Sequence, residues 1–530
     1  MRFLILVLGV LLICYCSTVH GQGRGGMMRG MQGMGSRMGG GMRAGGGGGS
    51  DSLSFEKRNY ADDSVNVRFR YLDTARYSGF DSSISDFYRR VPLKPELIHI
   101  GQNGNATRPI LFNPLRKPGW DAGFHAFDPY RWDIADTRFM NTTKPFTELG
   151  YLVGSKAEQQ ISILHTQNVK PDWNFVLNYR LVNAPGTFNS QNSNHNNIRF
   201  NSDYHTKNQR YHAYLILLSN ALQSSENGGI ESEDFIINPN PAYDDRFNIP
   251  TNMATTTFSS RNFFNVKLST GNRYVDRHML LRQHYDFGKK DSIVTDSSVV
   301  RFFLPRLRME HTIHSSGYRY KFFDVQAQGA SDYYSQFYGI STLPDTLNFE
   351  SNWKILRNDF SLIQFPDPKN PLQFFKAGVG VSNFSSSPDS IRDVFTNIVA
   401  HGEYRNRTRN RKWDALLYGE FYAAGRDIGN YQVQASLQRV LDKVGQLEIG
   451  FQNINRSPSY LYQRKTSFPI QLPSQVNDEN VSALKGSLFL SKWNTRLSVE
   501  YFLISNYTYV RDFASVDQYA PVFNFVRAGI

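Results

Sequence analysis

The stretch YQVQASLQRV, residues 431–440, alternates between apolar and polar side chains over most of its length. Successive side chains of a β-strand point to opposite faces of the sheet. Tyr431 and Val433 would therefore share one face, and Gln432 and Gln434 the other. This period of two predicts a strand that is apolar on one side and polar on the other.

The same alternation recurs along the chain. It is present in residues 173–181, 374–384, 413–422, 447–455, 484–490 and 497–505. Many of these runs hold about 9–11 residues, the length that a tilted strand needs to cross a bilayer. Aromatic residues make up 14% of the chain, yet the mean hydropathy is only −0.46. Many rings combined with a polar average exclude a bundle of membrane helices and favour half-apolar strands.

The connections between these runs differ in length. Residues 153–157 and 442–446 predict tight turns, whereas residues 183–207 and 223–258 predict long polar loops. Short turns at one rim and long loops at the other are typical of outer-membrane barrels, as are strand ends rich in Tyr, Trp and Phe. A soluble β-sandwich would show the same alternation. The choice between a sandwich and a membrane barrel therefore depends on the loop lengths and on the aromatic residues at the strand ends. We expect an all-β fold, a transmembrane antiparallel β-barrel of about 14–18 strands.

Residues 1–21 have the features of a secretory signal peptide. A basic residue precedes an apolar run, residues 3–16, which is shorter than the ~18 residues of a membrane helix. Cleavage is expected near Gln22, and it would remove Cys14 and Cys16, the two cysteines of the chain. The mature chain would then have no thiol chemistry.

Residues 22–50 are mostly Gly, Met and Arg, a composition that cannot bury enough surface to become ordered. We interpret them as a disordered leader, with a basic tether for soft metals or anionic headgroups as the alternative. Residues 51–530 would form the barrel with an N-terminal extension. Five arginines in residues 1–50 supply 5 of the net charge of +13, so residues 51–530 carry +8, an excess that is mild for their length and does not indicate a nucleic-acid partner.

Six short motifs follow one another in the N-terminal half. They are DT (73–74), SDFYRR (85–90), FDPY (127–130), KPFT (144–147), HTQNV (165–169) and ENGGI (226–230). In this order they resemble the putative-porin family of outer-membrane proteins from Bacteroidetes-type bacteria. The resemblance extends from about residue 64 onward and is densest between residues 65 and 230. It implies a secreted outer-membrane barrel, and it brings no catalytic residues and no cofactor.

The expected function is therefore that of an outer-membrane porin, through which small polar solutes diffuse passively. Its expected partners are outer-membrane lipid, lipopolysaccharide and the barrel-assembly machinery, together with further copies of the chain in a homo-oligomer. One alternative is a plugged barrel with a structural or partner-docking role in an envelope complex. A second is a secreted soluble β-protein that binds glycans. We expect no enzyme activity.

The last residues, 522–530 (VFNFVRAGI), lack the terminal aromatic with which such barrels usually finish. Either the terminus is unusual or the sequence is truncated at its C-terminus. We expect truncation, which makes the strand number provisional.

Four arginines, Arg405, Arg407, Arg409 and Arg411, alternate within residues 403–413. If one strand contained all four, they would point to one side and form a positive ladder in the lumen that favours anions. Alternatively, they belong to a loop that contacts lipopolysaccharide phosphates, or to a solvated turn. These arginines are the candidate pore-lining or anion-contact residues.

Four histidines are candidates for a metal site or for the base of an esterase site: His278, His284, His311 and His314. His311 and His314 are three residues apart, which places them on opposite faces of a strand. No HExxH or GxSxG motif accompanies them. We therefore expect girdle or lumen histidines, with no metal ligand and no catalytic residue.

Overall fold

The computed structural model describes residues 66–73, 78–80, 93–188, 190–245, 249–254, 268–295, 298–387, 392–442, 444–463 and 466–530, without the side chains of residues 293–302. All of them belong to the second of two units, residues 59–530. The predicted signal peptide and leader, residues 1–50, lie outside the described residues. Within the described ranges, no helix is both long and apolar enough to span a membrane.

Sixteen antiparallel strands form one sheet, a number within the predicted range. They are β6 (Phe146–Val153), β7 (Gln159–Lys170), β8 (Trp173–Ala184), β9 (Ser193–His205), β10 (Tyr211–Ser225), β11 (Thr270–Thr295), β12 (Ser298–Asp324), β13 (Leu347–Gln364), β14 (Gln373–Ser387), β15 (Val394–Arg407), β16 (Trp413–Ala424), β17 (Tyr431–Leu441), β18 (Gly445–Arg456), β19 (Glu479–Leu490), β20 (Thr495–Ser505) and β23 (Phe523–Gly529). Each strand pairs with the next in this order, and every run predicted from the alternation lies within one of them.

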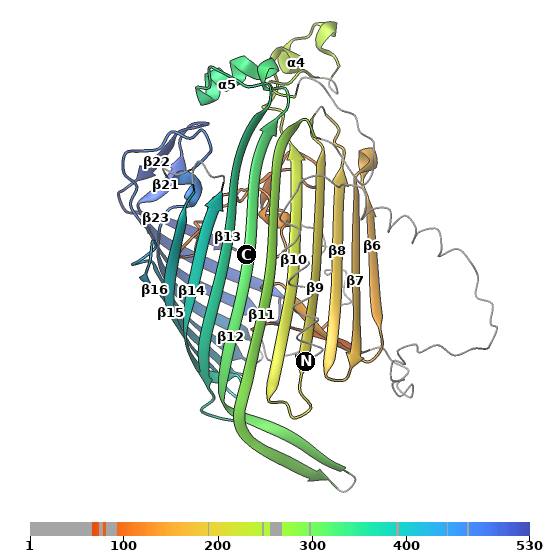
Figure 1. The fold of residues 1–530 in the computed structure, drawn as a ribbon, viewed down its shortest axis with the longest axis vertical. Coiled ribbons are helices and arrows are strands. Elements are labelled where there is room, and N and C mark those ends of the chain that lie inside the picture. Colours follow the sequence, from red (N-terminus) through yellow and green to blue (C-terminus); the bar gives the residue numbers. More distant parts are fainter. Residues whose placement is uncertain are drawn as a thin grey trace, which may run out of the picture. The chain divides into compact units, whose positions relative to one another are not determined.

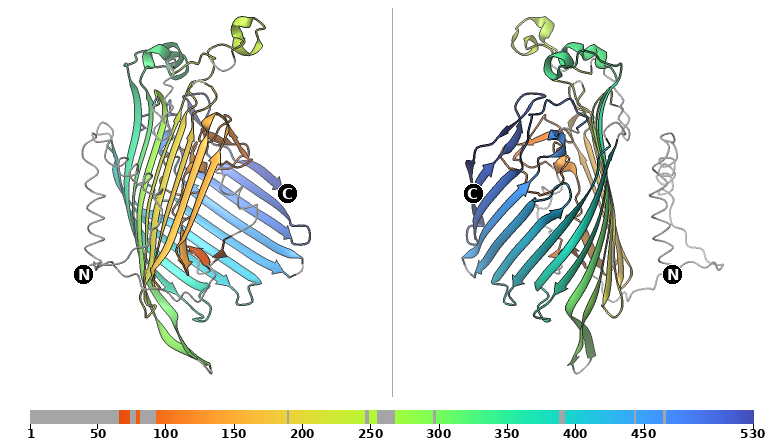
Figure 2. Two further views of the ribbon diagram at one scale, coloured as in Figure 1. Left: turned by 90° about the vertical axis from the view of Figure 1, so that its right-hand side faces the viewer. Right: turned by 60° about the vertical axis from the view of Figure 1, so that its left-hand side comes forward.

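The sheet curls strongly on itself (Figures 1 and 2). Its two edges are β6 and β23, and no pairing joins them among the described residues. The fold is thus an all-β antiparallel barrel whose hydrogen-bonded ring is incomplete.

Side-chain exposure is inverted relative to that of a soluble β-protein. On β17, the apolar side chains of Val433 and Leu437 are 40% and 44% exposed. On the inner face, Asn197, Asn220 and Asp276 are at most 2% exposed. An apolar exterior and a polar interior are typical of a barrel in lipid. This pattern argues against the soluble glycan-binding alternative.

The two rims carry connections of different length, as predicted. One rim has tight turns, such as residues 171–172, 206–210 and 491–494, and the predicted turn between β17 and β18 lies there as well. The predicted turn between β6 and β7, residues 154–158, is tight but lies at the opposite rim, because successive connections of an antiparallel sheet alternate between the rims. That rim also has long connections, such as residues 226–269, 325–346 and 457–478. Helices α4 (Asp234–Ile237) and α5 (Ser331–Tyr338) lie beyond this long-loop rim (Figure 1). The same rim holds the 3-10 turns η3 (Pro241–Tyr243), η4 (Ala327–Ala330) and η6 (Tyr460–Tyr462) and the hairpin of β21 (Tyr507–Val510) and β22 (Val516–Tyr519).

The prediction of one long loop at residues 183–207 is wrong. Only residues 185–192 connect β8 to β9, and the Asn-rich run that follows is a strand. Asn197 and Asn201 of this strand face inward and find partners there: Asn201 Nδ2, for example, donates to the Arg138 carbonyl at 3.1 Å. Asparagine normally disfavours strands because it competes for backbone hydrogen bonds, and here the interior supplies those bonds.

The hairpin of β11 and β12 extends past its neighbours. β10 pairs with β11 only as far as Tyr285, and β13 pairs with β12 only from Leu307 onward. The remaining part projects alone beyond the short-turn rim (Figure 1), and the register shifts between Phe287 and Gly288 where it leaves the sheet.

The chain before β6 forms small elements on the inner side of the sheet. β1 (Val67–Tyr71) pairs with β2 (Ser78–Gly79) and with β5 (Arg138–Thr142). β3 (Leu97–His99) pairs with β4 (Thr107–Pro109), and the 3-10 turn η1 (Asp128–Tyr130) follows. The turn η2 (Ser155–Ala157) lies between β6 and β7.

Candidate functional site

Residues 93–137, here called the luminal segment, cross the interior of the barrel. Their aromatic side chains pack against rings on the inner face of the sheet. Trp120 lies 5.4 Å from the Trp353 ring on β13, and Phe124 stacks on Tyr320 of β12 at 4.5 Å, measured between ring centroids. Aromatic pairs at such distances add to the energy of burial. The lumen therefore contains a packed core along this segment.

The turn η1 is fixed to β8 and β9. Tyr130 is fully buried, and its ring lies 4.7 Å from that of His195. Its carbonyl oxygen accepts hydrogen bonds from Arg180 Nη2 at 2.5 Å and from Asn197 Nδ2 at 3.0 Å. Asn197 Nδ2 also donates to Asn220 Oδ1 on β10 at 2.6 Å. Buried polar side chains of the wall thus satisfy backbone groups of a segment that has little regular structure of its own.

An ion pair continues this attachment to β11. Arg131 Nη2 lies 3.4 Å from Asp276 Oδ2, and Arg131 Nη1 lies 3.0 Å from Asp128 Oδ1. Asp276 also accepts a hydrogen bond from Asn220 Nδ2 at 2.9 Å. The carboxylate is therefore compensated by charge and by hydrogen bonding, as burial requires.

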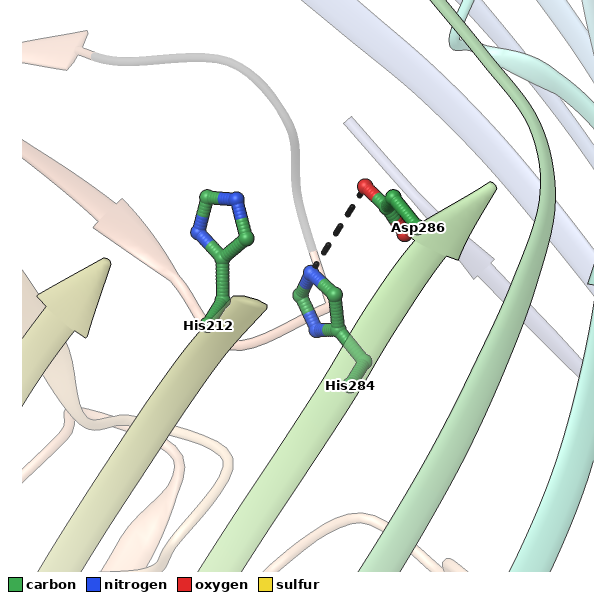
Figure 3. Close-up of side chains that lie close together, drawn as sticks. All are labelled: His212, His284 and Asp286. Atoms are coloured by element: carbon green, nitrogen blue, oxygen red, sulfur yellow. Dashed lines mark ion pairs between the residues drawn. The ribbon is translucent and has the colours of Figure 1, made fainter. Parts of the chain in front are cut away.

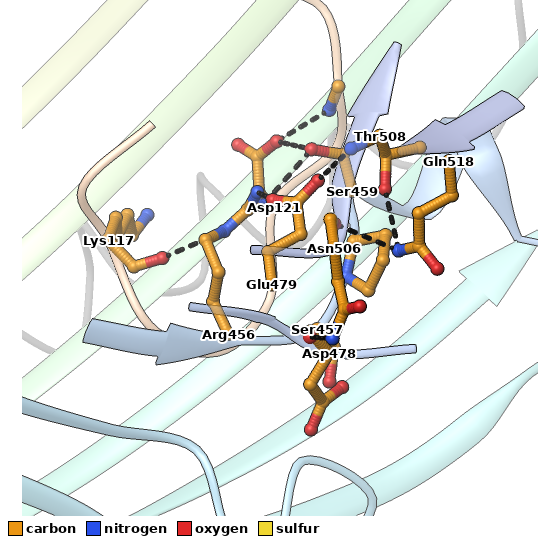
Figure 4. A network of polar contacts seen from close by, with 12 residues as sticks. Lys117, Asp121, Arg456, Ser457, Ser459, Asp478, Glu479, Asn506, Thr508 and Gln518 are labelled. Atoms are coloured by element: carbon orange, nitrogen blue, oxygen red, sulfur yellow. Dashed lines mark hydrogen bonds and ion pairs between the residues drawn. The ribbon is translucent and has the colours of Figure 1, made fainter. Parts of the chain in front are cut away.

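On the opposite wall, the luminal segment enters a second polar network, drawn in Figure 4. The carbonyl oxygen of Lys117 accepts from Arg456 Nε at 3.2 Å, and Asp121 accepts from Ser459 Oγ at 2.5 Å. Arg456 also pairs with Glu479 of β19. The segment is therefore held from both sides of the barrel.

The luminal segment also contacts both edges of the sheet. Near β6, the backbone N–H of Asn103 donates to Glu158 Oε1 at 2.9 Å. Near β23, the Phe112 ring lies 5.3 Å from Phe525, and Arg116 Nη1 lies 3.7 Å from Glu500 Oε1 on β20. A short stretch of chain thus connects two strands that do not pair with each other.

His125 of the luminal segment lies between two carboxylates. Its Nδ1 is 2.8 Å from Asp128 Oδ2, and its Nε2 is 3.2 Å from Asp121 Oδ2. Burial alone would lower the pKa of this imidazole, but the hydrogen bonds and charges of the two carboxylates raise it to about 10. His125 is therefore protonated at neutral pH.

The four candidate arginines do not share one strand. β15 ends at Arg407, so Arg409 and Arg411 lie in the turn before β16. Arg405 Nη2 is 3.1 Å from Asp414 Oδ2, and Arg407 Nε is 3.9 Å from the same oxygen. Arg409 pairs with Asp367 of a neighbouring turn. Their role as pore-lining or anion-contact residues stays a prediction.

The histidines of β11 and β12 lie on different faces. His311 is 6.0 Å from Phe360, an exposed ring of the outer face, whereas His314 Nε2 lies 3.3 Å from His278 Nδ1 inside. The distribution over opposite faces was expected from the spacing.

Sequence reasoning missed the luminal segment itself. Its apolar residues recur neither every second residue, as in a strand, nor every 3.6 residues, as in a helix, so its pattern predicted no element. The signal that could have found it is the density of rings in a stretch without strand pattern: Trp120, Phe124, Phe127, Tyr130 and Trp132. Rings at that density need a core to pack against.

An apolar exterior, a polar interior and a sixteen-stranded antiparallel sheet define a β-barrel protein of the outer membrane. The chain belongs to the family described as putative porin, which matches residues 60–530. The family that the sequence motifs indicated is thereby confirmed.

Three solved structures illustrate what the chain is similar to. The siderophore receptor PirA from Acinetobacter baumannii is 10% identical, with a TM-score of 0.42 over 72% of this chain and 56% of that one. The copper transporter OprC is 10% identical, with a TM-score of 0.47 over 82% and 61%. The ferric-catecholate import receptor Fiu from K12 E. coli is 12% identical, with a TM-score of 0.37 over 73% and 63%. This chain spans less than two thirds of the length of each, and no curated protein matches it.

Proposed function

We propose that this protein is a gated solute-uptake barrel, in which the luminal segment blocks the passage at rest and solutes enter when it is displaced. The occupied lumen carries this proposal. Rings of the segment pack on both walls, and its backbone is bound by Arg180, Asn197 and Arg456. This arrangement corresponds to the plugged barrel that was one alternative from the sequence. The proposal differs from that alternative in giving the barrel a role in transport.

Small polar solutes are the class that the inner wall would accept. Its buried side chains include amides, hydroxyls and paired charges, which would replace the hydrogen bonds of a hydrated solute. The proposed role is passage and selection without turnover chemistry. Outer-membrane lipid would cover the apolar exterior.

The test is the conductance of the full-length protein in a planar bilayer. The wild type should give few steps, whereas a Trp120→Ala, Phe124→Ala variant should open often, because it loses the ring contacts of the segment and leaves the wall unchanged. Trp413→Ala removes an exposed outer ring and serves as the matched control, which should behave as the wild type does.

Passive diffusion through a permanently open pore is the second candidate, favoured by the description of the family. It predicts steady steps of one size in the wild type, unchanged in the Trp120→Ala, Phe124→Ala variant. A folded variant that stays silent would contradict both transport roles and would favour a structural or partner-docking barrel.

A further inference from the structure

Three histidines form a row across neighbouring strands near the short-turn rim. His205 of β9 is the register partner of His212 on β10, and His212 is the register partner of His284 on β11. The rings of His205 and His212 are 5.6 Å apart and those of His212 and His284 are 4.7 Å apart, with interplanar angles of 19° and 20°. Directly paired residues of antiparallel strands point to the same face, so the row follows from the register.

A carboxylate completes the group. Asp286 follows His284 by two residues on β11, so both side chains lie on the inner face. His284 Nε2 is 4.0 Å from Asp286 Oδ2, the contact that is dashed in Figure 3. Three possible ligand atoms, one from each of His212, His284 and Asp286, lie within 4.8 Å of one another.

His284 has an unusual environment for a buried imidazole. The residue is 4% exposed, and neither of its ring nitrogens has a hydrogen-bond partner in the part of the chain that the structure describes. Buried polar atoms of side chains are nearly always paired, so an orphaned imidazole between a second imidazole and a carboxylate requires an explanation.

We propose that His212, His284 and Asp286 bind a divalent transition metal ion of the Zn²⁺ class. Two imidazole nitrogens and one carboxylate oxygen are ligands that zinc, copper and nickel accept, whereas Ca²⁺ and Mg²⁺ prefer oxygen ligands alone. Bonds of about 2.0–2.2 Å to a tetrahedral ion place ligand atoms ~3.4 Å apart. The ligand atoms now lie within 4.8 Å of one another, so the ion would have to draw them together by up to about 1.4 Å.

The simpler alternative is that Asp286 serves only as the counter-ion of Arg308. Arg308 Nε and Nη2 donate to its two oxygens at 2.7 and 2.9 Å. This pairing leaves a lone pair on each oxygen for a metal, and a partner that orients a ligating carboxylate is common around metal sites. It does not, however, account for the unpaired nitrogens of His284. The guanidinium charge nearby should moderate the affinity.

The test is metal binding by the full-length protein, purified in detergent through a tag without histidine and stripped with a chelator. Titration with Zn²⁺ against a chromophoric chelator should show one ion per chain. His284→Gln and His212→Gln should each weaken binding at least about tenfold. His311→Gln, which removes a histidine from the outer face of β12, is the matched control and should bind as the wild type does.

Unmeasurable Zn²⁺ binding by the wild type would overturn the proposal, and so would binding that His284→Gln leaves unchanged. A second measurement needs no variant. Co²⁺ added to the wild type should give the intense visible absorption of a four-coordinate ion with nitrogen and oxygen ligands. The weak spectrum of the hydrated ion alone would contradict the site.

Discussion

Leu417 shows what the inverted exposure means for a single residue. It lies in the middle of β16, points outward and is 51% exposed. In water, an exposed leucine tolerates replacement by a charged residue within about 0.5 kcal/mol. In lipid, an arginine near the midplane of the bilayer costs about 2–4 kcal/mol. We expect Leu417→Arg to lower the free energy of unfolding by the larger amount, measured by urea titration in lipid vesicles.

The control for this variant is Gln434→Arg, which places the same charge on the inner face of the adjacent strand β17. It should cost much less, because the lumen is polar. Equal and small effects at both positions would contradict the assignment of the outer face to lipid.

His125 predicts a dependence of stability on pH. Its pKa in the folded protein is about 10, above the value of 6.5 expected for the unfolded chain. A raised pKa means that protonation stabilises the fold: the contribution is complete below pH 6.5 and is lost as the pH rises toward 10. The wild type should therefore lose stability between pH 7 and pH 10, measured by heat-induced loss of the compact form in detergent.

His125→Gln should remove this contribution while keeping a side chain of similar size. Its stability should fall less over the same interval, and the two proteins should become alike near pH 10. A wild type and variant with parallel pH profiles would show that the two carboxylates do not hold the imidazolium.

At the scale of elements, β9 shows that a strand can depend on what faces it. Asn197 is fully buried, donates to Tyr130 and Asn220, and accepts from Arg180 Nε at 3.2 Å. Asn197→Ala would leave buried partners unpaired, at a cost of about 1–3 kcal/mol for such a group. We expect a loss of that size in urea unfolding, together with faster proteolysis of the luminal segment.

Asn524→Ala, on the exposed face of β23, is the matched substitution and should have no comparable effect. If Asn197→Ala leaves both stability and proteolysis unchanged, the amides of β9 are not what holds η1 in place.

The alternation of residues was sufficient to predict elements whose two faces meet uniform surroundings. For β17 and β18 these surroundings are lipid outside and polar lumen inside, and the periods of two at residues 431–440 and 447–455 predicted both strands. β9 was not predicted as a strand because its stability as a strand depends on carbonyl groups of a segment distant in sequence. The group of His212, His284 and Asp286 was not predicted for a related reason. The register of β10 and β11 brings His212 beside His284, and this register cannot be read from the sequence.

At the scale of the whole molecule, the luminal segment joins the two edges of an incomplete barrel. Its contacts with Glu158 on one side and with Glu500 and Phe525 on the other replace, in part, the missing pairing of β6 with β23. Replacing residues 93–137 by a short Gly–Ser linker should therefore destabilise the barrel and open it. We expect loss of the compact, heat-modifiable form on electrophoresis.

A deletion variant that kept the heat-modifiable form and the urea midpoint of the wild type would contradict this role. The luminal segment would then contribute nothing to the stability of the barrel.

The path of the luminal segment also sets an order of events in folding. Its partners lie far along the chain: Pro118 meets Tyr422, Lys117 meets Arg456 and Phe112 meets Arg527, at separations of 304, 339 and 415 residues. Contacts of such high order form late and slowly. Residues 112–118 are synthesised before these partners, so their contacts have to wait until the strands that carry the partners have been made. The sheet then has to curl around a segment whose partners are spread over strands made early and late.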